Sequence, residues 1–311
     1  MPKIVKLPRH LAGPIALAAT AIIAGAPARA NQGQDLMKAA IPRAGPHLAQ
    51  TGSEPKTFSF GVVPRWTPTR LAERWIPVLR YVSDACGVKL HMASAPSIGV
   101  FADRVNEGWY DFIFANPAQY LGGQSRGLYS AFARAPKPLS GIVFVSIFKS
   151  HEGIASLANA TMAFPSPHAF GATLVVRAEL DRLSVPIRPR FVRSHDSAVQ
   201  NVLKGATQAG TTVESIFDGL DPNIRGKLRV IYRTKGYTPH AFAVRPEKVP
   251  AKTARCVKRE LTGAEADSPV GSRLQAINLF PVIKATDSDW DDVRALDLGN
   301  STAFTSQQVR Q

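Results

Sequence analysis

FSFGVV at residues 58–63 begins the run of segments that decides the fold. It is followed by TPTRLAERWIPVLRYVSDACG (67–87), KLHMAS (89–94), SIGVFADRVNEG (97–108) and YDFIFA (110–115). The three short apolar segments predict strands, whereas Leu71, Trp75 and Val78 recur at the spacing of a helix face. Strands that alternate with helices are typical of a parallel sheet with helical crossovers.

A second series of the same kind follows LSGIVFVSIF (139–148), which predicts a longer strand. It contains the expected strands TMAFP (161–165), PRFVRS (189–194) and LRVIYRT (228–234), and expected helices over 167–183 and 195–205. Beyond it, AFAVRP (241–246) predicts a strand, and 250–262 and 288–296 predict helices that return to the first unit. We therefore expect an α/β fold of two lobes, each a mainly parallel sheet flanked by helices. Lobe I comprises 58–149 and 238–300, and lobe II comprises 150–237.

The first 30 residues have the form of a signal peptide. Three cations precede the mainly apolar stretch LAGPIALAATAIIAGAPARA (11–30), and Ala28 and Ala30 supply the small residues of a cleavage site. An uncleaved anchor is the alternative, but the apolar core is short for a bilayer span of ~20 residues. We expect cleavage after Ala30, export, a flexible leader over 31–57 and a polar tail over 301–311.

Composition limits the class of protein further. The 311 residues are 45% hydrophobic, which excludes a disordered polymer and a multi-span membrane protein, and two cysteines are too few for a disulfide scaffold. A net charge of +15 favours anionic partners, and export argues against nucleic acid. Cys86 and Cys256 permit one long-range disulfide in an oxidising compartment, and buried free thiols are the alternative.

Three predicted strands end in a polar residue followed by proline: Thr67-Pro68, Asn116-Pro117 and Ser166-Pro167. Each pair predicts the start of a helix, because the polar side chain accepts a free N–H and proline needs no acceptor. Helix starts at the carboxyl edge of an α/β sheet face the crevice where ligands bind, and their free N–H groups attract anions. For any single pair, an ordinary helix cap remains the alternative.

Three histidines also lie at the ends of predicted strands. His195 opens the helix that follows PRFVRS, and His168 and His240 also lie at predicted strand ends. An imidazole there donates to a ligand or, alternatively, serves as a structural residue. No HxxxH pair is present, so we expect no metal site, and without a GxSxG, GxxxxGK[ST], HExxH or CxxC motif we expect neither an enzyme nor a cofactor.

Five segments occur in a characteristic order: FGVVP (60–64), YDFIFANPAQY (110–120), TMAFPSPHAFGATLVVRAEL (161–180), RSHDSAVQNVLKG (193–205) and LDPNIRGKLRVIYRTKGYTPHAF (220–242). This ordered set resembles the PhnD-like receptors for phosphate, phosphite and phosphonate that serve ABC importers. The resemblance covers most of 58–300. It implies a type II periplasmic binding fold, in which two lobes joined by two crossover strands close over one ligand.

The resemblance also implies a binding site. It assigns ligand contacts to Ser166, His168 and Ala169 at a helix start, to His195, to Asn116 and Tyr120, and to the walls Trp66, Thr67, Tyr237 and His240. Two departures concern the ligand: Ser166-Pro167-His168 replaces a Ser-Thr-Ser cluster, and AGTT (209–212) replaces the carboxylates that hold an amine. We therefore expect phosphate, phosphite or a simple alkylphosphonate, and other tetrahedral oxyanions remain open.

The function implied is that of a monomeric periplasmic solute-binding protein that delivers its oxyanion to an ABC permease. Two alternatives follow from the same residues. Closure of the lobes would equally serve a sensor that contacts the periplasmic domain of a histidine kinase. From another class, a periplasmic hydrolase would use His195 as its base and would show turnover.

Overall fold

The computed structural model of the protein describes residues 55–296. The expected signal peptide, most of the expected leader and the expected polar tail lie outside the described residues. Within them, the expected alternation of strands and helices is confirmed, and it forms two sheets of six and five strands. Among the described helices, none is both long and apolar enough to cross a membrane.

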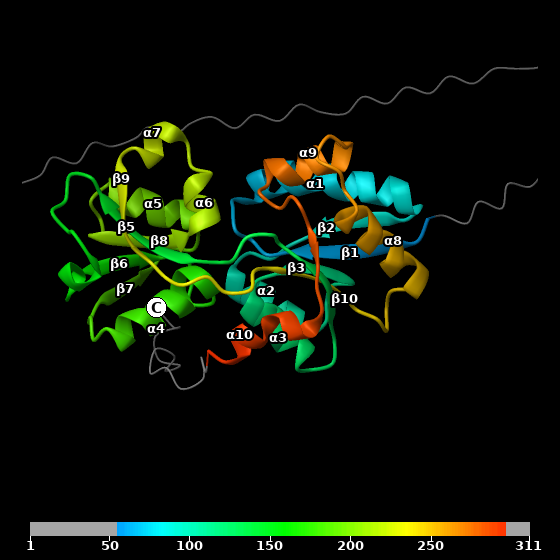
Figure 1. The fold of residues 1–311 in the computed structure, drawn as a ribbon, viewed down its shortest axis with the longest axis horizontal. Coiled ribbons are helices and arrows are strands. Elements are labelled where there is room, and N and C mark those ends of the chain that lie inside the picture. Colours follow the sequence, from blue (N-terminus) through cyan, green and yellow to red (C-terminus); the bar gives the residue numbers. More distant parts are fainter. Residues whose placement is uncertain (1–54, 297–311) are drawn as a thin grey trace, which may run out of the picture. The chain divides into compact units, whose positions relative to one another are not determined.

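The first sheet has the strand order β11-β4-β10-β3-β1-β2. Its strands are β1 (Thr57–Val62), β2 (Lys89–Ala93), β3 (Phe112–Ala115), β4 (Ser130–Arg134), β10 (Ala241–Val244) and β11 (Ile283–Lys284). Figure 1 shows α1 (Pro68–Cys86) and α9 (Pro269–Ala276) on one side of this sheet, and α2 (Ile98–Asn106) and α3 (Pro117–Gln124) on the other. The remaining C-terminal elements are α8 (Ala251–Thr262), a 3-10 turn (Asp287–Trp290) and α10 (Asp291–Arg294).

Aromatic side chains join α1 to this sheet. Trp75 is fully buried and lies 4.9 Å from the Phe114 ring and 5.9 Å from the Phe60 ring. Leu71 and Val78 lie on the same buried face of the helix, as their spacing predicts. Burying one such side chain contributes roughly 1.5–3 kcal/mol, so this face fixes α1 on the sheet.

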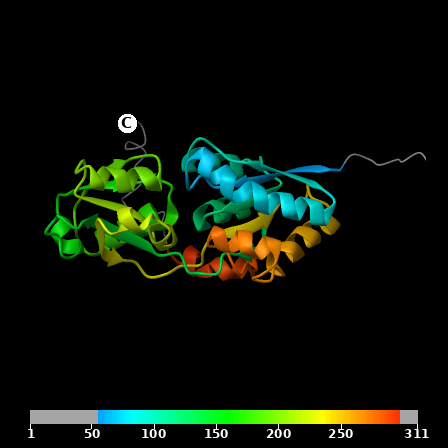
Figure 2. The same cartoon turned by 90° about the horizontal axis from the view of Figure 1, so that it is seen from above.

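The second sheet has the order β7-β6-β8-β5-β9. Its strands are β5 (Gly141–Ser146), β6 (Thr161–Phe164), β7 (Arg188–Phe191), β8 (Ala209–Val213) and β9 (Leu228–Arg233). Its helices are a π-helical turn (Phe170–Val175) continued by α4 (Val176–Arg182), then α5 (His195–Leu203), α6 (Glu214–Asp218) and α7 (Pro222–Arg225). Alternate residues of β5 enter two separate cores, Ile142 and Phe144 on the α5 side and Val143 and Val145 on the α4 side. The second sheet is therefore covered on both faces, and Figure 2 shows the same elements from above.

Two crossovers connect the sheets. The chain leaves the first sheet between β4 and β5 and returns between β9 and β10. The two crossover segments are paired at Leu139 and Tyr237, whose N–H groups donate to each other's carbonyls at 2.8 and 3.2 Å. Each strand that follows a crossover, β5 or β10, pairs antiparallel with both of its neighbours, which makes both sheets mixed.

The crossover position corrects the expected lobe boundary. We expected residues 139–148 to end lobe I, but β5 pairs with β8 and β9 in the second sheet. An apolar strand has the same sequence pattern in either sheet, so the pattern does not predict which strands it pairs with. The return of residues after Pro239 to the first sheet is confirmed by β10.

Local structure also differs at some expected elements. The helix expected from Pro167 begins at Phe170, because Ser166 instead forms a turn in which its Oγ accepts the His168 N–H at 3.2 Å. The other two expected helix starts are confirmed, with Thr67 before α1 and Asn116 before α3. The short strands β4, β8 and β11 and the helix α9 were not expected from the sequence.

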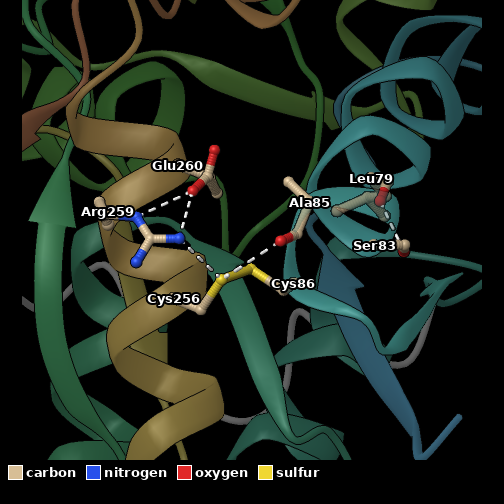
Figure 3. Close-up of a disulfide and its surroundings, with 7 residues drawn as sticks. All are labelled: Leu79, Ser83, Ala85, Cys86, Cys256, Arg259 and Glu260. Atoms are coloured by element: carbon tan, nitrogen blue, oxygen red, sulfur yellow. Dashed lines mark hydrogen bonds and ion pairs between the residues drawn. A yellow bond between two sulfur atoms is a disulfide. The ribbon is translucent and has the colours of Figure 1, made fainter.

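Cys86 and Cys256 form a disulfide with a Cα–Cα distance of 5.8 Å. Figure 3 shows that the bond joins the last residue of α1 to the middle of α8. Gly87 ends α1 in the left-handed region at φ 62°, where glycine carries no Cβ penalty. Of the two alternatives for these cysteines, a disulfide or buried free thiols, the structure contains the disulfide.

Candidate functional site

A small cavity of about 20 Å³ lies where the carboxyl ends of strands meet the starts of helices. From the first sheet and its helices it is lined by Val63 and Arg65 after β1, Ile98 at the start of α2, Asn116 before α3 and His240 before β10. We call it the central cavity. Its volume exceeds the ~10–15 Å³ that one water requires, so it suits a compact group.

The rest of the lining belongs to the crossover and the second sheet. Leu139 lies in the crossover, residues 169–172 open the helix that continues into α4, His195 is the first residue of α5, and Val213 ends β8. Both sheets therefore contribute to one cavity. Among the described residues that line it, none is a carboxylate.

Arg65 is the charged group of this cavity. The residue is only 7% exposed, and its Nε has no hydrogen-bond partner among the described residues. Its guanidinium lies 4.8 Å from the centre of the Trp66 ring, a cation–π contact. Burial, and secondarily the nearby Arg74, lowers the pKa of Arg65 to about 10, so it remains charged at neutral pH. A buried cation with a free donor lacks only an anionic acceptor.

Two buried histidines face the same space. The Nδ1 of His195 lies 2.8 Å from the Oγ1 of Thr212, which fixes the ring at the start of α5. Burial, and secondarily the charge of Arg65, lowers the pKa of His195 to about 3. His240 stacks on Phe114 with ring centres 5.0 Å apart, and burial, Arg65 and His195 hold its pKa well below the usual 6.5. Both imidazoles are neutral at pH 7, and each has one N–H to donate.

The helix start at Phe170 adds main-chain donors. The first bonds of this helix run from the N–H groups of Thr173 and Leu174 to the carbonyl of Ala169, at 2.8 and 3.2 Å. The N–H groups of residues 170–172 precede these bonds and have no acceptor inside the helix. The strand β5 packs closely behind them, since a Cβ on Gly141 would stand 2.1 Å from the carbonyl oxygen of Gly171.

Asn116 connects the two sheets at the cavity. Its side chain forms a capping box with Gln119, whose backbone N–H it binds at 3.0 Å. Its Nδ2 donates to the backbone carbonyl of His168 at 3.2 Å. A single residue thus caps α3 and holds the segment that precedes the Phe170 helix start.

Four of the expected site residues line the central cavity: Asn116, Ala169, His195 and His240. Trp66 and Thr67 instead line a second, larger cavity beside it. Sequence reasoning did not single out Arg65 among the 38 lysines and arginines, because most of its surroundings come from distant segments of the chain. Its position between an apolar strand end and Trp66 is the one local signal for its burial.

Four other expected residues lie outside the lining. The Tyr120 hydroxyl donates to Asp287 at 2.6 Å. Ser166 and His168 form the turn before the Phe170 helix, and Tyr237 packs edge-on against Phe170 at 6.0 Å. The described residues contain no group of three or more His, Cys, Asp or Glu side chains placed to hold a metal ion.

Two α/β units joined by paired crossovers, with a small cavity at their strand ends that both units line, define a bilobal solute-binding protein. The family model described as ABC transporter, phosphonate, periplasmic substrate-binding protein matches residues 60–290. The chain belongs to this family, whose members are substrate-binding components of transporters with the type II periplasmic binding fold. No curated protein matches the chain.

Solved structures agree on the fold. A binding protein component of an ABC phosphonate transporter from Pseudomonas aeruginosa superposes with a TM-score of 0.70 at 13% identity, over 78% of this chain and 85% of that one. PhnD1 from Prochlorococcus marinus, solved in complex with methylphosphonate, has a TM-score of 0.70 at 15% identity, over 78% and 97%. A Xanthomonas citri protein bound to chloride ion has a TM-score of 0.64 at 16% identity, over 77% and 95%.

Proposed function

We propose that this protein captures one small tetrahedral oxyanion, namely phosphate, phosphite or a simple alkylphosphonate, in the central cavity and delivers it to an ABC permease. It acts as a monomer in the periplasm. The observation that carries the proposal is Arg65, a buried cation whose Nε has no partner among the described residues. An oxyanion supplies the acceptor that this group lacks.

The surrounding donors complete the binding. The first N–H groups of the Phe170 helix and the N–H of His240 can each donate to an oxygen of the anion. His195 can donate its Nε2–H when its Nδ1 accepts from the Thr212 hydroxyl. A hydrogen bond to a charged acceptor contributes ~1.5–3 kcal/mol, so several of them offset the dehydration of the anion. Because the donors come from both sheets, the anion favours the closed arrangement of the lobes.

The hydrolase alternative is less well supported. A general base works best with a pKa near the working pH, and burial lowers the pKa of His195 to about 3. At that value the imidazole is a weak base that would hold an abstracted proton poorly. The sensor alternative uses the same closure, and none of the described contacts favours it over transport.

A thermal-shift screen of the mature protein tests the proposal with phosphate, phosphite, methylphosphonate, sulfate and arsenate. We expect at least one phosphorus oxyanion to raise Tm, since a ligand at 100 times its Kd stabilises the folded state by ~2.7 kcal/mol. Calorimetry should then give one site per chain and no turnover. A flat response to every anion would contradict an oxyanion receptor.

A further inference from the structure

Thr212 contacts a residue of the central cavity without lining the cavity itself. It belongs to β8, whose five residues are all buried. Opposite it in β5 stands Ile142, whose side chain enters the core on the α5 side. Because directly opposed residues of an antiparallel pair point to the same face of a sheet, Thr212 also faces α5. Its hydroxyl therefore meets the first turn of that helix, where His195 lies.

The Thr212 hydroxyl has one hydrogen-bond partner among the described residues. Its Oγ1 lies 2.8 Å from the Nδ1 of His195. Thr212 is 0% exposed, so bulk solvent does not reach the hydroxyl and offers no second acceptor for its proton. The hydroxyl proton is therefore shared with Nδ1 of His195 or has no acceptor in the described part of the chain.

This single contact decides which ring nitrogen of His195 carries the proton. The imidazole is neutral, because burial lowers its pKa to about 3, and it therefore has one N–H. If the Thr212 hydroxyl donates to Nδ1, both atoms are satisfied and the ring proton is on Nε2. If Nδ1–H donated to the hydroxyl instead, a buried hydroxyl proton would lack an acceptor. That penalty favours the Nε2–H tautomer by about fivefold or more.

The nearby cation does not reverse this preference. A guanidinium that donated to Nε2 would favour the opposite tautomer, with the lone pair on that nitrogen. The Nε of Arg65 has no partner among the residues described, so it does not donate to His195. Both residues line the central cavity, and an anion there can accept from each of them.

From this arrangement we infer that Thr212 is a positioning residue, which fixes the Nε2–H tautomer of His195 and thereby presents a donor to the anion in the central cavity. The inference rests on the proposed function and adds which nitrogen meets the anion and which residue sets it. The anion's oxygen at His195 then carries no proton, because two donors cannot share a hydrogen bond. The AGTT segment (209–212) thus acts on the ligand through His195 rather than by direct contact.

Nitrogen NMR of the unliganded, 15N-labelled protein measures the tautomer directly, with His195→Asn to assign the signal. We expect the proton on Nε2 and an Nδ1 whose chemical shift is that of a hydrogen-bond acceptor. Thr212→Val keeps the shape of the side chain and removes the hydroxyl, so the acceptor shift of Nδ1 should disappear. Thr212→Ser retains a hydroxyl and should keep it.

Titration calorimetry with methylphosphonate and inorganic phosphate measures the effect on binding. Thr212→Val frees the ring, so both Kd values should rise about fivefold to tenfold, the value of roughly one hydrogen bond. Thr212→Ser should bind within about threefold of the natural protein. Thr211→Val is the matched control, because Thr211 is equally buried but its Oγ1 donates to the Ala163 carbonyl at 3.3 Å. It should change neither the Nδ1 signal nor the Kd.

Two results would overturn the inference while the proposed function stands: a proton on Nδ1 in the natural protein, or a folded Thr212→Val variant that binds as tightly as the natural protein. If Thr212→Val does not fold, the tautomer of the natural protein decides. If neither anion binds the natural protein, the proposed function fails, and the signal of the unliganded protein still shows whether Thr212 fixes the His195 ring.

Discussion

Arg65 is a buried cation, and among the described residues that line the central cavity there is no carboxylate to pair with it. Burial lowers the pKa of Arg65 from 12.5 to about 10, and each pKa unit corresponds to ~1.4 kcal/mol. Keeping the guanidinium charged in this place therefore costs the folded state about 3 kcal/mol, partly offset by the Trp66 ring. We attribute the buried charge of Arg65 to the anion that it is proposed to bind.

Replacing Arg65 by methionine should consequently separate stability from binding. We expect Arg65→Met to raise the unfolding free energy of the unliganded protein by about 1–3 kcal/mol, since an apolar side chain of similar length needs no acceptor. The same change should weaken oxyanion binding at least a hundredfold. Urea unfolding and calorimetry check the two effects, with the exposed Arg188→Met as control. A variant that binds normally would remove Arg65 from the site.

The buried histidines make stability depend on pH. The folded pKa of His195 is about 3 and the unfolded value is ~6.5, so below pH 6.5 the unfolded chain binds more protons. The unfolding free energy is therefore highest above pH 6.5 and falls as the pH decreases toward 3. By pH 5 the loss from His195 alone is about 2 kcal/mol.

Urea unfolding of the unliganded protein at pH 7.5 and pH 5.0 measures this loss. His195→Asn removes the titrating group, so its difference between the two pH values should be smaller than that of the natural protein by about 2 kcal/mol. His91→Asn, which changes an exposed histidine of β2, should leave the difference unchanged. The same pH dependence in all three proteins would show that His195 does not titrate as its burial implies.

At the scale of single elements, the disulfide fixes α8 on α1 (Figure 3). It closes a loop of 170 residues, and loss of such a bond destabilises small exported domains by ~2–5 kcal/mol. The double variant Cys86→Ser, Cys256→Ser should lower the unfolding free energy by about that amount. Neither cysteine lines the central cavity, so the Kd for the oxyanion should change less than twofold. A large loss of affinity would mean that the bond positions the site.

Helices and strands with a strong local sequence pattern were predictable from the sequence. Which strands pair with one another in a sheet was not. Trp75 and Val78 mark a helix face within one segment, and Asn116-Pro117 marks a helix start within two residues. By contrast, β5 is apolar whichever sheet it joins. Short strands such as β11, with two residues, contain too few alternations to be recognised.

The candidate site shows the same division. His195 and Asn116 stand beside predicted helix starts, where local rules apply, and both line the central cavity. Arg65 matters because of what surrounds it, and its neighbours His195 and His240 lie more than a hundred residues away in the chain. Tyr120 was expected in the site but does not line the cavity, because its hydroxyl donates to Asp287, 167 positions away in the chain. Contacts between distant segments decide burial, and a single sequence does not encode them legibly.

For the molecule as a whole, the proposed binding depends on donors that belong to different sheets. Arg65 and His240 come from the first sheet, and His195 and the Phe170 helix start come from the second. The sheets are connected by two crossovers paired at Leu139 and Tyr237, and an Arg70–Asp196 ion pair at 3.6 Å joins α1 to α5. The Asn116–His168 hydrogen bond also joins the two units, and a half-buried ion pair contributes only ~0–1 kcal/mol. We expect the proposed anion to add to these contacts and to favour the closed arrangement further.

Hydrogen exchange with and without methylphosphonate tests this coupling. If one anion contacts both sheets, saturation should slow exchange of amides in two separate segments, the loop over 63–66 and the helix start over 169–174. Amides of α7, none of whose residues lines either cavity, should exchange as before. With Arg65→Met at the same anion concentration, protection should disappear from both segments together, because the helix start cannot hold the anion alone. Protection confined to one segment would mean that the anion binds one lobe without drawing in the other.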